Sequence, residues 1–494
     1  MGTGEPADSR KICGTARHRG LPLAALAGPR CGIDRIQMKR IRSKFGGLIP
    51  GRTSLGAKVL QAGGWSIIQV VGVNVLRLAS NLILTRYLVP EAFGMMAMIG
   101  TLLTAFNLFT DIGLTQSIIR DRDGEEAHFL RVAWTIKLIR GFLIAGGVLL
   151  AALGLWVFAP SLAPPQTVYA DPRLPILVAL SALAPVMIGA ESTTKELLTR
   201  RLQNWRFTVV EIGTQVISLI AMVIFVQFSP TVWALLAGML LMSVIKMVAS
   251  HLFYPGPWMQ LAHDREIRDR LWHFGKFLMG SSSFSFIARQ ADKFILAALL
   301  NATAFGLYVI AQIWAFAGQA FVNQLATRVG FPAMSDIIRN RPEDLRRLFR
   351  KFQNALDVFC FGAFVVTFLL GDLLIRTLYE AEYHAAGTYL SILSLSFLVI
   401  RFRTLDNLLV NMGNSRSALV ISVVRAISIC VTIPLSYNMF GLEVTLLVVA
   451  MNAGITAPYT MILLRPTLGD KQFLYDCIWL VGSVLAAVLV YLSL

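Results

Sequence analysis

Hydrophobic residues fill long stretches of this chain, and polar residues gather in short segments between them. A helix that crosses the hydrocarbon core of a bilayer needs about 20 predominantly apolar residues. We predict spans at residues 64–86, 93–118, 132–158, 174–194, 207–228, 231–252, 277–300, 305–328, 353–375, 385–410, 417–438, 442–464 and 473–493. The pattern therefore predicts an all-α polytopic membrane protein with thirteen spans, or with 12 or 14 if the C-terminal end is assigned differently.

Two basic segments between the spans have an amphipathic pattern. In residues 341–352, Pro342 suits a first helical turn, and apolar residues recur on one face while basic residues occupy the other. Residues 264–274 repeat the pattern. Helices of this kind lie in the membrane surface. We therefore predict interfacial helices here and disfavour nucleic acid as a partner of the basic faces.

Composition and charge agree with a membrane protein. Of the 494 residues, 56% are hydrophobic and 15% are charged, whereas soluble domains carry about 25% charged residues, so a soluble enzyme is excluded. Lys and Arg outside the spans concentrate in the even-numbered loops, and cytoplasmic loops are enriched in these residues. We therefore predict a cytoplasmic N-terminus.

An internal repeat occurs at an offset of 212 residues. Residues 83–94 and 295–306 are identical at six of twelve positions, and the same shift places Arg77 opposite Arg289. Six predicted spans separate the two copies, so both begin on the same side of the membrane. We predict two six-helix lobes related by a pseudo-two-fold axis along the membrane normal, with at least one extra C-terminal helix. Transporters built from such halves bind substrate between them.

The repeat and the basic N-terminus together predict the domain organisation. Residues 1–62 carry 12 basic and 3 acidic residues, an excess that suits contact with anionic lipids. Residues 1–37 lack apolar periodicity, and we predict that translation from Met38 gives a functional protein. The predicted parts are an N-terminal extension (1–62), an N-lobe (63–252), a cytoplasmic linker (253–276), a C-lobe (277–464) and a C-terminal helix (465–494).

Charged residues inside predicted spans are candidates for function, because a charge at the bilayer centre costs roughly 2.5–3.5 kcal/mol or more. The candidates are Arg77, Asp111, Glu211, Arg289, Asp292, Lys293, Asp357 and Arg425. We predict that they face a water-filled cavity or each other. The span of Arg77 contains no acidic residue, which favours a role in binding a ligand, whereas Arg289 and Asp292 have the spacing of a structural ion pair.

Other polar residues in the spans allow several roles. Asp111 and Glu211 suit either proton carriers or hydrogen-bonded structural carboxylates. A second group of basic residues stands near helix ends, and we predict that their side chains extend to the membrane surface. This group is Lys137, Arg140, Arg401 and Arg403.

Enzymatic and metal-binding signatures are absent from the sequence. The five cysteines are scattered, the six histidines form no paired-ligand spacing, and no phosphate-binding glycine-rich loop is present. The longest outer loop, 159–173, is too short to hold the sugar substrates of a membrane glycosyltransferase. We predict a non-enzyme without metal or cofactor.

Several segments together resemble one transporter family over about residues 45–465. They are residues 84–94 (LTRYLVPEAFG), 111–114 (DIGL), 288–294 (ARQADKF), 304–308 (AFGLY), 331–335 (FPAMS) and 341–349 (RPEDLRRLF). The set resembles the Wzx-type oligosaccharide flippases, the polysaccharide-transporter family of the MOP superfamily. The resemblance implies two six-helix lobes around a central cavity in the bacterial inner membrane. It also implies transport of undecaprenyl-pyrophosphate-linked oligosaccharide for exopolysaccharide, capsule or O-antigen synthesis.

The resemblance assigns roles to the polar residues of the spans. Arg77, Arg289 and Lys293 would hold the pyrophosphate, and neighbouring polar residues would bind phosphate or sugar. These neighbours are Asn74, Asn81, Asp111, Gln319 and Asn323, while Asp292, Glu211 and Arg425 are assigned coupling or structural roles. The implied partners are the lipid-linked oligosaccharide, membrane lipids and the polymerase and export proteins of the pathway. Two alternatives are a MATE-type cation exporter, disfavoured because residues 64–86 contain no acid, and a non-transporting assembly protein.

Overall fold

The computed structural model of the chain describes residues 55–325, 334, 342–412 and 414–493. The chain divides into two compact units, Met1–Lys58 and Val59–Leu494, and the account below concerns the second. The predicted start at Met38, most of the predicted N-terminal extension and all but Met334 of the 331–335 motif lie outside the described residues.

The described part of the chain is built from α-helices without a named strand. The first half contains α2 (Leu55–Leu84), α3 (Pro90–Phe109), α4 (Leu114–Arg120), α5 (Ala127–Leu162), α6 (Leu174–Ser181), α7 (Leu183–Ala190), α8 (Thr194–Arg200), α9 (Asn204–Phe228) and α10 (Val232–Phe253). The second half contains α11 (Arg265–Leu299), α12 (Ala302–Leu325), α14 (Leu345–Leu378), α15 (Ala385–Leu393), α16 (Ser396–Ile400), α17 (Phe402–Asn411), α18 (Ser415–Phe440), α19 (Leu442–Met451), α20 (Ala457–Leu468) and α21 (Asp470–Ser493). Short 3-10 helices join some of them: η2 (Val168–Ala170), η4 (Pro342–Asp344), η5 (Ala381–Tyr383) and η6 (Asn452–Gly454).

Ten helical segments of the described residues are long and apolar enough to cross a membrane. The number is eleven if α6–α7 and α8, which are bent by 53° at a short break, count as one span. These segments coincide with eleven of the thirteen predicted spans, and α11 and α12 occupy the positions of the other two. The chain is therefore a multi-pass membrane protein of the predicted all-α class.

The prediction of separate interfacial helices is wrong. Residues 265–274 form the first part of α11, a single helix of 35 residues. Residues 345–352 likewise form the first part of α14, which has 34 residues and follows the 3-10 turn that begins at Pro342. Helix propagation adds a hydrogen bond for every residue fixed, and no proline separates the amphipathic segments from the apolar spans that follow.

The starts of α3, α11 and α12 have recognisable local causes. α3 begins at Pro90, a residue whose fixed φ suits a first helical position. The Asn301 side chain accepts a hydrogen bond of 2.7 Å from the Ala304 N–H at the start of α12. The Asp264 carboxylate accepts from the N–H groups of Glu266 and Ile267 and thereby caps α11.

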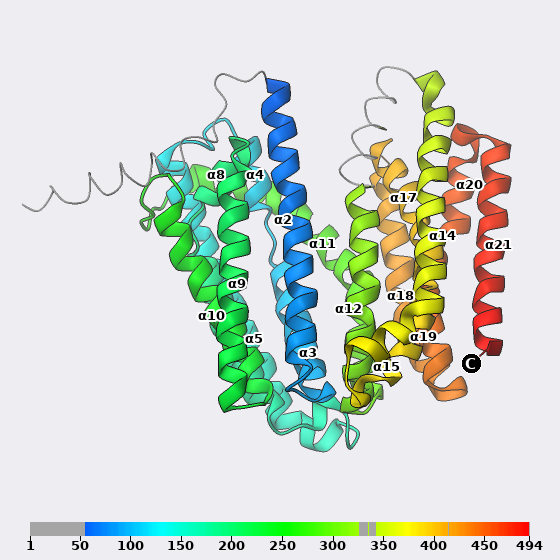
Figure 1. Cartoon of the computed structure of the whole chain (residues 1–494). Coiled ribbons are helices and arrows are strands. Elements are labelled where there is room, and N and C mark those ends of the chain that lie inside the picture. The colour runs from blue at the N-terminus through cyan, green and yellow to red at the C-terminus, as the bar shows by residue number, and fades with distance from the viewer. Residues whose placement is uncertain (1–54, 326–333, 335–341, 413, 494) are drawn as a thin grey trace, which may run out of the picture. The chain divides into compact units, whose positions relative to one another are not determined.

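The 212-residue repeat extends through both halves of the described chain. Shifting the bounds of α3 by 212 gives 302–321, against Ala302–Leu325 for α12. Shifting α9 gives 416–440, against Ser415–Phe440 for α18, and shifting α10 gives 444–465, against the α19–α20 segment Leu442–Leu468. The helices thus form an N-lobe (α2–α10) and a C-lobe (α11–α20), and Figure 1 shows α11 passing between them. The fold class predicted from the repeat is confirmed.

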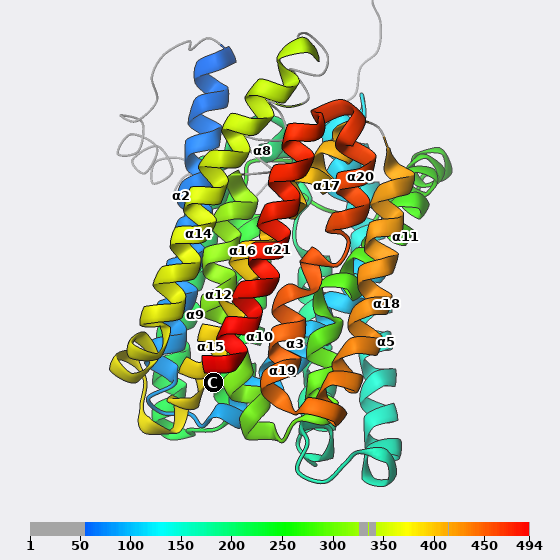
Figure 2. The ribbon, with the colours of Figure 1, turned by 90° about the vertical axis from the view of Figure 1, so that its right-hand side faces the viewer.

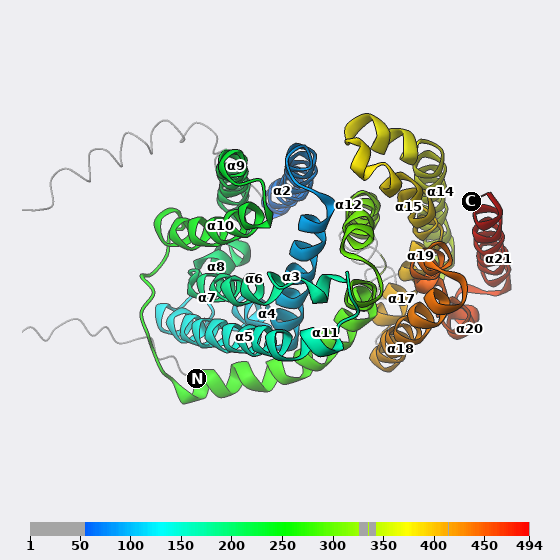
Figure 3. The same cartoon turned by 90° about the horizontal axis from the view of Figure 1, so that it is seen from below.

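Equivalent residues of the two lobes touch each other where α3 packs on α12. A Cβ added at Gly94 would lie 3.3 Å from the backbone nitrogen of Gly306, its counterpart at the 212 offset. A Cβ added at Gly306 would lie 2.0 Å from the carbonyl oxygen of Pro90, the counterpart of Ala302. Contacts between equivalent positions are expected on a two-fold axis. The pseudo-two-fold axis therefore passes between these helices, which face each other in Figure 3.

One end of the molecule carries several hydrogen bonds between the lobes, while at the other end Arg270 of α11 donates to Asp121 and Asp123. We call the first of these ends the odd-loop end, because it carries residues 85–89, 163–173, 300–301 and 379–384. The Tyr379 hydroxyl donates to the Asn81 side chain at 2.8 Å, and the Tyr383 hydroxyl donates to the carbonyl of Leu88. The Thr303 hydroxyl donates to Glu91, its counterpart at the 212 offset. The two lobes are thus joined directly at this end.

The last helix lies outside the repeat. α21 follows α20 through Gly469, whose φ of +87° is a backbone conformation that glycine adopts most easily. Figure 2 shows α21 alongside the C-lobe, with α14 and α20 as neighbours. This helix is the extra C-terminal element that the repeat predicts.

Candidate functional site

A polar cavity of about 550 Å³ lies inside the C-lobe. Its lining comes from α11, α12, the α15–α19 segments and η6. Five of the sequence-predicted residues line it: Arg289, Asp292, Gln319, Asn323 and Arg425. Polar lining residues that sequence reasoning did not select are Gln312, Ser396, Arg403, Asp406, Asn407, Ser422 and Asn452. The cavity is therefore richer in both charge and hydrogen-bonding groups than predicted.

Three arginines contribute to the lining of the C-lobe cavity. Arg425 forms an ion pair of 2.8 Å with Asp406 and donates to the Ala453 carbonyl at 2.8 Å. Arg403 lies close enough to Arg425 and Arg289 for their charges to act on it. The prediction that Arg403 extends to the membrane surface is therefore wrong, because this residue of α17 lines the cavity.

Asp292 is almost fully buried beside the same cavity. Its carboxylate accepts hydrogen bonds from the Tyr308 hydroxyl and from the Gln312 amide, the latter at 2.9 Å. The ion pairs between described residues do not include Arg289 with Asp292, so the structural ion pair considered from their spacing is not formed. The Asp292 carboxylate is held by α12 instead.

Arg77 lies on α2, away from the lining of the C-lobe cavity. Its guanidinium donates to the Asn74 side chain at 2.8 Å. The charge of Asp292 and, less strongly, that of Arg77 act on Lys293 of α11, and the Lys293 ammonium lies 5.5 Å from the centre of the Phe316 ring. Two predicted phosphate ligands, one from each lobe, are thus near neighbours. Arg289, the repeat counterpart of Arg77, lines the cavity instead.

Asn81 and Gln319 are engaged in contacts within the protein. Asn81 accepts from Tyr379, whose hydroxyl also accepts from the Trp314 indole at 2.8 Å. The Gln319 amide donates to the Ser396 hydroxyl at 2.8 Å, at the edge of the cavity. Asn81 therefore contributes to the contact between the lobes, whereas Gln319 faces the cavity.

Three acidic residues at or near the N-lobe spans have basic partners. Asp111 lies 3.9 Å from Arg140, and its carboxylate accepts a hydrogen bond of 3.0 Å from the Gly113 N–H. Glu211 forms an ion pair with Lys246. Lys137 lies 3.7 Å from Glu191. The prediction that Lys137 and Arg140 extend to the membrane surface is therefore wrong, because both reach carboxylates inside the lobe.

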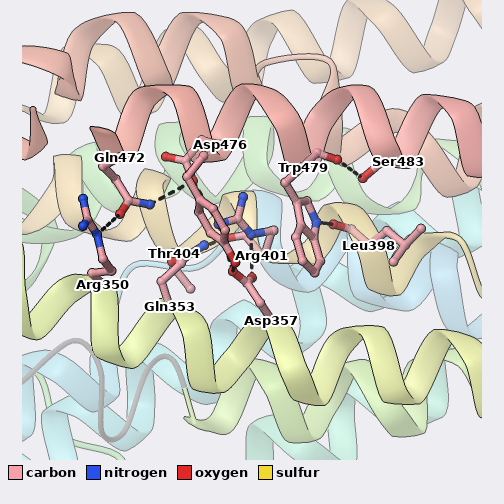
Figure 4. A network of polar contacts seen from close by, with 11 residues as sticks. Arg350, Gln353, Asp357, Leu398, Arg401, Thr404, Gln472, Asp476, Trp479 and Ser483 are labelled. Atoms are coloured by element: carbon pink, nitrogen blue, oxygen red, sulfur yellow. Dashed lines mark hydrogen bonds and ion pairs between the residues drawn. The ribbon is translucent and has the colours of Figure 1, made fainter. Parts of the chain in front are cut away.

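A buried ionic network joins α14, the α16–α17 segment and α21 (Figure 4). The Arg401 side chain is 0% exposed and forms ion pairs of 2.6 Å with Asp357 and 2.9 Å with Asp476. Tyr475 donates to Asp357 at 3.1 Å, and Gln472 donates to Asp476 at 3.0 Å. Arg401 was also predicted to extend to the membrane surface, and this prediction is wrong. The network attaches the extra helix to the C-lobe.

The family of the chain follows from comparison with known proteins. A model of the family described as "Polysaccharide biosynthesis protein" matches residues 83–388. This match spans more than half of the sequence. The chain belongs to this polysaccharide biosynthesis protein family.

Curated relatives agree with this family. The chain is 24% identical over 283 residues to the succinoglycan biosynthesis transport protein ExoT of Rhizobium meliloti, covering 56% of this chain and 54% of that protein. It is 23% identical over 317 residues to the lipopolysaccharide biosynthesis protein WzxC of Escherichia coli, covering 63% and 61% respectively. The matches thus span less than two thirds of these relatives. They confirm the resemblance to Wzx-type flippases that the sequence motifs carry.

Solved structures show the same fold at low sequence identity. The lipid II flippase MurJ in an inward closed conformation has a TM-score of 0.62 and 15% identity, with 87% of this chain and 97% of that chain covered. A multidrug resistance MATE family transporter of the MOP superfamily, in an inward-facing conformation, has a TM-score of 0.60 and 13% identity, with 83% and 98% covered. The polysaccharide biosynthesis protein thus has the MOP-superfamily fold.

Proposed function

We propose that the protein is a flippase that moves undecaprenyl-pyrophosphate-linked oligosaccharide from the cytoplasmic to the outer leaflet of the bacterial inner membrane. The cations Arg77 and Lys293 carry this proposal, because one comes from each lobe and the charge of Arg77 acts on Lys293 besides that of Asp292. An anionic substrate between them would relieve their repulsion. Membership of the polysaccharide biosynthesis family supports a saccharide as the transported group. The isoprenoid chain would remain in the lipid.

The binding residues follow from the placement of the cations. Arg77, Lys293 and Arg289 would hold the pyrophosphate, and arginine suits this role because its planar guanidinium can bind two phosphate oxygens at once. Asn74 orients Arg77 through its hydrogen bond. Gln319 and Asn323 would meet the sugar in the C-lobe cavity. Asp111 is left out of the proposed site, because Arg140 and the Gly113 N–H already engage its carboxylate.

Transport would proceed by alternating access. The lobes contact each other at the odd-loop end through Tyr379, Tyr383 and Thr303, and these contacts would break when the site opens to the outer leaflet. The proposed orientation, with the N-terminus and the even loops in the cytoplasm, makes this end the outer one. Moving two negative charges outward across ~100 mV, negative inside, releases about 4.6 kcal/mol. The membrane potential could therefore drive export, and polymerase and export proteins would receive the unit outside.

An exporter of organic cations is disfavoured by the state of the carboxylates. Such a protein needs intramembrane acids that can meet its substrate. No acidic residue occurs in the Gly63–Leu84 span, and Asp111 and Glu211 have basic partners. The likeness to a MATE transporter concerns the fold alone.

The test is complementation of polysaccharide export in cells that lack the native gene. Arg77→Ala and Arg289→Ala should each abolish export at normal membrane abundance, whereas Arg77→Lys should keep part of it, because the charge survives without the bidentate geometry. Arg86→Ala is the matched control, since this exposed arginine follows the same helix. Export at wild-type level by both Arg77→Ala and Arg289→Ala would contradict the proposed site.

A further inference from the structure

The described lining of the C-lobe cavity contains more arginines than carboxylates. Arg425 is paired with Asp406, and Asp292 is held by Tyr308 and Gln312. For Arg403, the structure gives no hydrogen bond or ion pair with any other described residue. The charges of Arg425 and Arg289 act on it, and the charge of Asp406, which Arg425 already engages, acts in the opposite sense. Among the described lining residues, three arginines therefore face two carboxylates.

A guanidinium that lines a cavity without a partner is stabilised by an anion. Removing a charge from water without a counter-charge is costly. Repulsion from two neighbouring arginines adds to this cost at Arg403. The Nε of Arg425 is buried and has no hydrogen-bond partner among the described residues. It therefore offers a second N–H donor in the lining of this cavity. Arg403 and Arg425 together therefore form a site for an oxyanion.

The surroundings indicate where this oxyanion comes from. The cavity volume of about 550 Å³ falls in the range of ligand sites. Beside the arginines, the lining offers the amides of Asn407 and Asn452 and the hydroxyl of Ser422, groups that suit the hydroxyls of a saccharide. Of the three proposed pyrophosphate ligands, Arg77 and Lys293 are not among the lining residues, whereas Arg289 is. Asn407 stands one helical turn after Arg403 on α17, and Ser422 stands one turn before Arg425 on α18. Because these saccharide-binding groups accompany Arg403 and Arg425, we assign the oxyanion at these two arginines to the sugar part of the substrate.

We propose that Arg403, with Arg425 positioned beside it by Asp406, binds an acidic substituent of the oligosaccharide, either a carboxylate or a phosphate ester. The inference rests on the proposed flippase function and adds the substrate class: the transported repeat unit is itself anionic. The N-lobe has no equivalent, because the counterpart of Arg403 at the 212 offset is Glu191, which lies 3.7 Å from Lys137.

The first test is the charge of the saccharide that accumulates when the gene is deleted from its natural host. The lipid-linked oligosaccharide is extracted, the saccharide is released from pyrophosphate by mild acid, and its retention on an anion exchanger is measured at pH 7. We expect the saccharide to be retained. Uronic acid and phosphorus analyses then distinguish a carboxylate from a phosphate ester as the source of its charge. A neutral saccharide would overturn the inference while leaving the flippase function intact. Absence of any accumulated lipid-linked saccharide would overturn both.

The second test uses thermal unfolding of the purified full chain with two probes. The probes are the released saccharide and undecaprenyl pyrophosphate without sugar. Arg403→Gln should weaken binding of the saccharide about tenfold or more, as expected for loss of a charged hydrogen bond, and leave binding of undecaprenyl pyrophosphate unchanged. Arg403→Lys should recover part of the saccharide affinity, and Arg86→Gln should behave as wild type.

Two results of the second test would contradict the proposal. Equal stabilisation of wild type and Arg403→Gln by the saccharide would mean that Arg403 does not bind it. If Arg403→Gln loses stabilisation by both probes equally, Arg403 either has a structural role or binds the pyrophosphate. Because the unfolding temperature without probes is measured in the same experiment, a variant that is merely misfolded is recognised, and Arg403→Lys then carries the comparison.

Discussion

In the N-lobe, three carboxylates at or near the spans pair with basic side chains, whereas in the C-lobe three arginines line a cavity. The N-lobe pairs are Asp111 with Arg140, Glu211 with Lys246, and Glu191 with Lys137. The C-lobe cavity instead combines Arg289, Arg403 and a paired Arg425. Because the two lobes share one helix plan, the difference lies in the side chains. It teaches that one helix plan accommodates partly buried ion pairs in the N-lobe and a cavity lined by arginines in the C-lobe.

The largest loss of stability is expected when the buried network that anchors α21 to the C-lobe is broken. Arg401→Leu leaves Asp357 and Asp476 buried without their counter-charge, and loss of one partner of a buried ion pair costs about 3–5 kcal/mol. Thermal unfolding in detergent measures the loss. Adding Asp357→Asn and Asp476→Asn to Arg401→Leu should recover much of the stability, because the unpaired charges are then removed. An unchanged unfolding temperature for Arg401→Leu alone would show that the network does not hold α21.

The next largest loss of stability is expected at the pseudo-two-fold axis, where the equivalent positions Gly94 and Gly306 leave different amounts of space for a side chain. In Gly306→Ala, the new Cβ would stand 2.0 Å from the Pro90 carbonyl oxygen, so α3 and α12 must move apart at a cost of about 1–3 kcal/mol. In Gly94→Ala, the nearest atom is the Phe305 side chain at 3.1 Å, and a smaller loss is expected. Gly100→Ala on α3 is the control, because no atom lies within 4 Å of its added Cβ. Equal unfolding temperatures for the Gly306 and Gly100 variants would contradict the close approach.

A smaller effect is expected from an N-lobe ion pair. Lys246→Ala leaves Glu211 without its partner, but the two side chains are 24% and 16% exposed, so water can compensate part of the loss. We expect about 1–2 kcal/mol of destabilisation. The Lys246→Ala, Glu211→Ala double variant should show less loss than the sum of the single variants in a double-mutant cycle. A loss as large as that of Arg401→Leu would remove the distinction between the two lobes.

The smallest loss of stability is expected in the predicted linker, and this loss depends on pH. The hydrogen bond that the Ile267 N–H donates to the Asp264 carboxylate lowers the pKa of Asp264. A lowered pKa in the folded state gives stability that is present above the unfolded-state pKa and is lost as pH falls through the folded-state pKa. Asp264→Ala should therefore reduce the unfolding temperature slightly at pH 7 and have no effect at a pH below both pKa values. A difference that persists undiminished at acidic pH would contradict the capping role.

The fold could be predicted further than the site could. The repeat was visible in the sequence because the identities at residues 92–94 and 304–306 lie where α3 meets α12, and only small residues permit that approach. The lengths of the apolar stretches predicted the helices. The interfacial helices were predicted wrongly because an amphipathic pattern does not reveal whether the helix continues into the next span.

The candidate site was predicted only where helix periodicity carried the signal. Arg289 and Gln319 lie inside long regular helices, and both line the cavity. Arg403 stands near the end of a predicted span, where the sequence pattern does not distinguish an arginine that lines a cavity from one that reaches the membrane surface. The pairing of Arg401 with Asp476 joins residues 75 positions apart in different helices, which a single sequence does not indicate.

The central claim is that cations from both lobes carry an anionic lipid-linked oligosaccharide across the bilayer. The most direct measurement places the purified chain in vesicles whose outer leaflet contains undecaprenyl-pyrophosphate-linked oligosaccharide and follows the fraction of sugar that periodate can oxidise from outside. The account predicts that this fraction falls with time for wild type and Arg86→Ala and stays constant for Arg77→Ala and Arg289→Ala. Wild-type vesicles that behave like protein-free vesicles, or arginine variants that move the sugar at the wild-type rate, would contradict it.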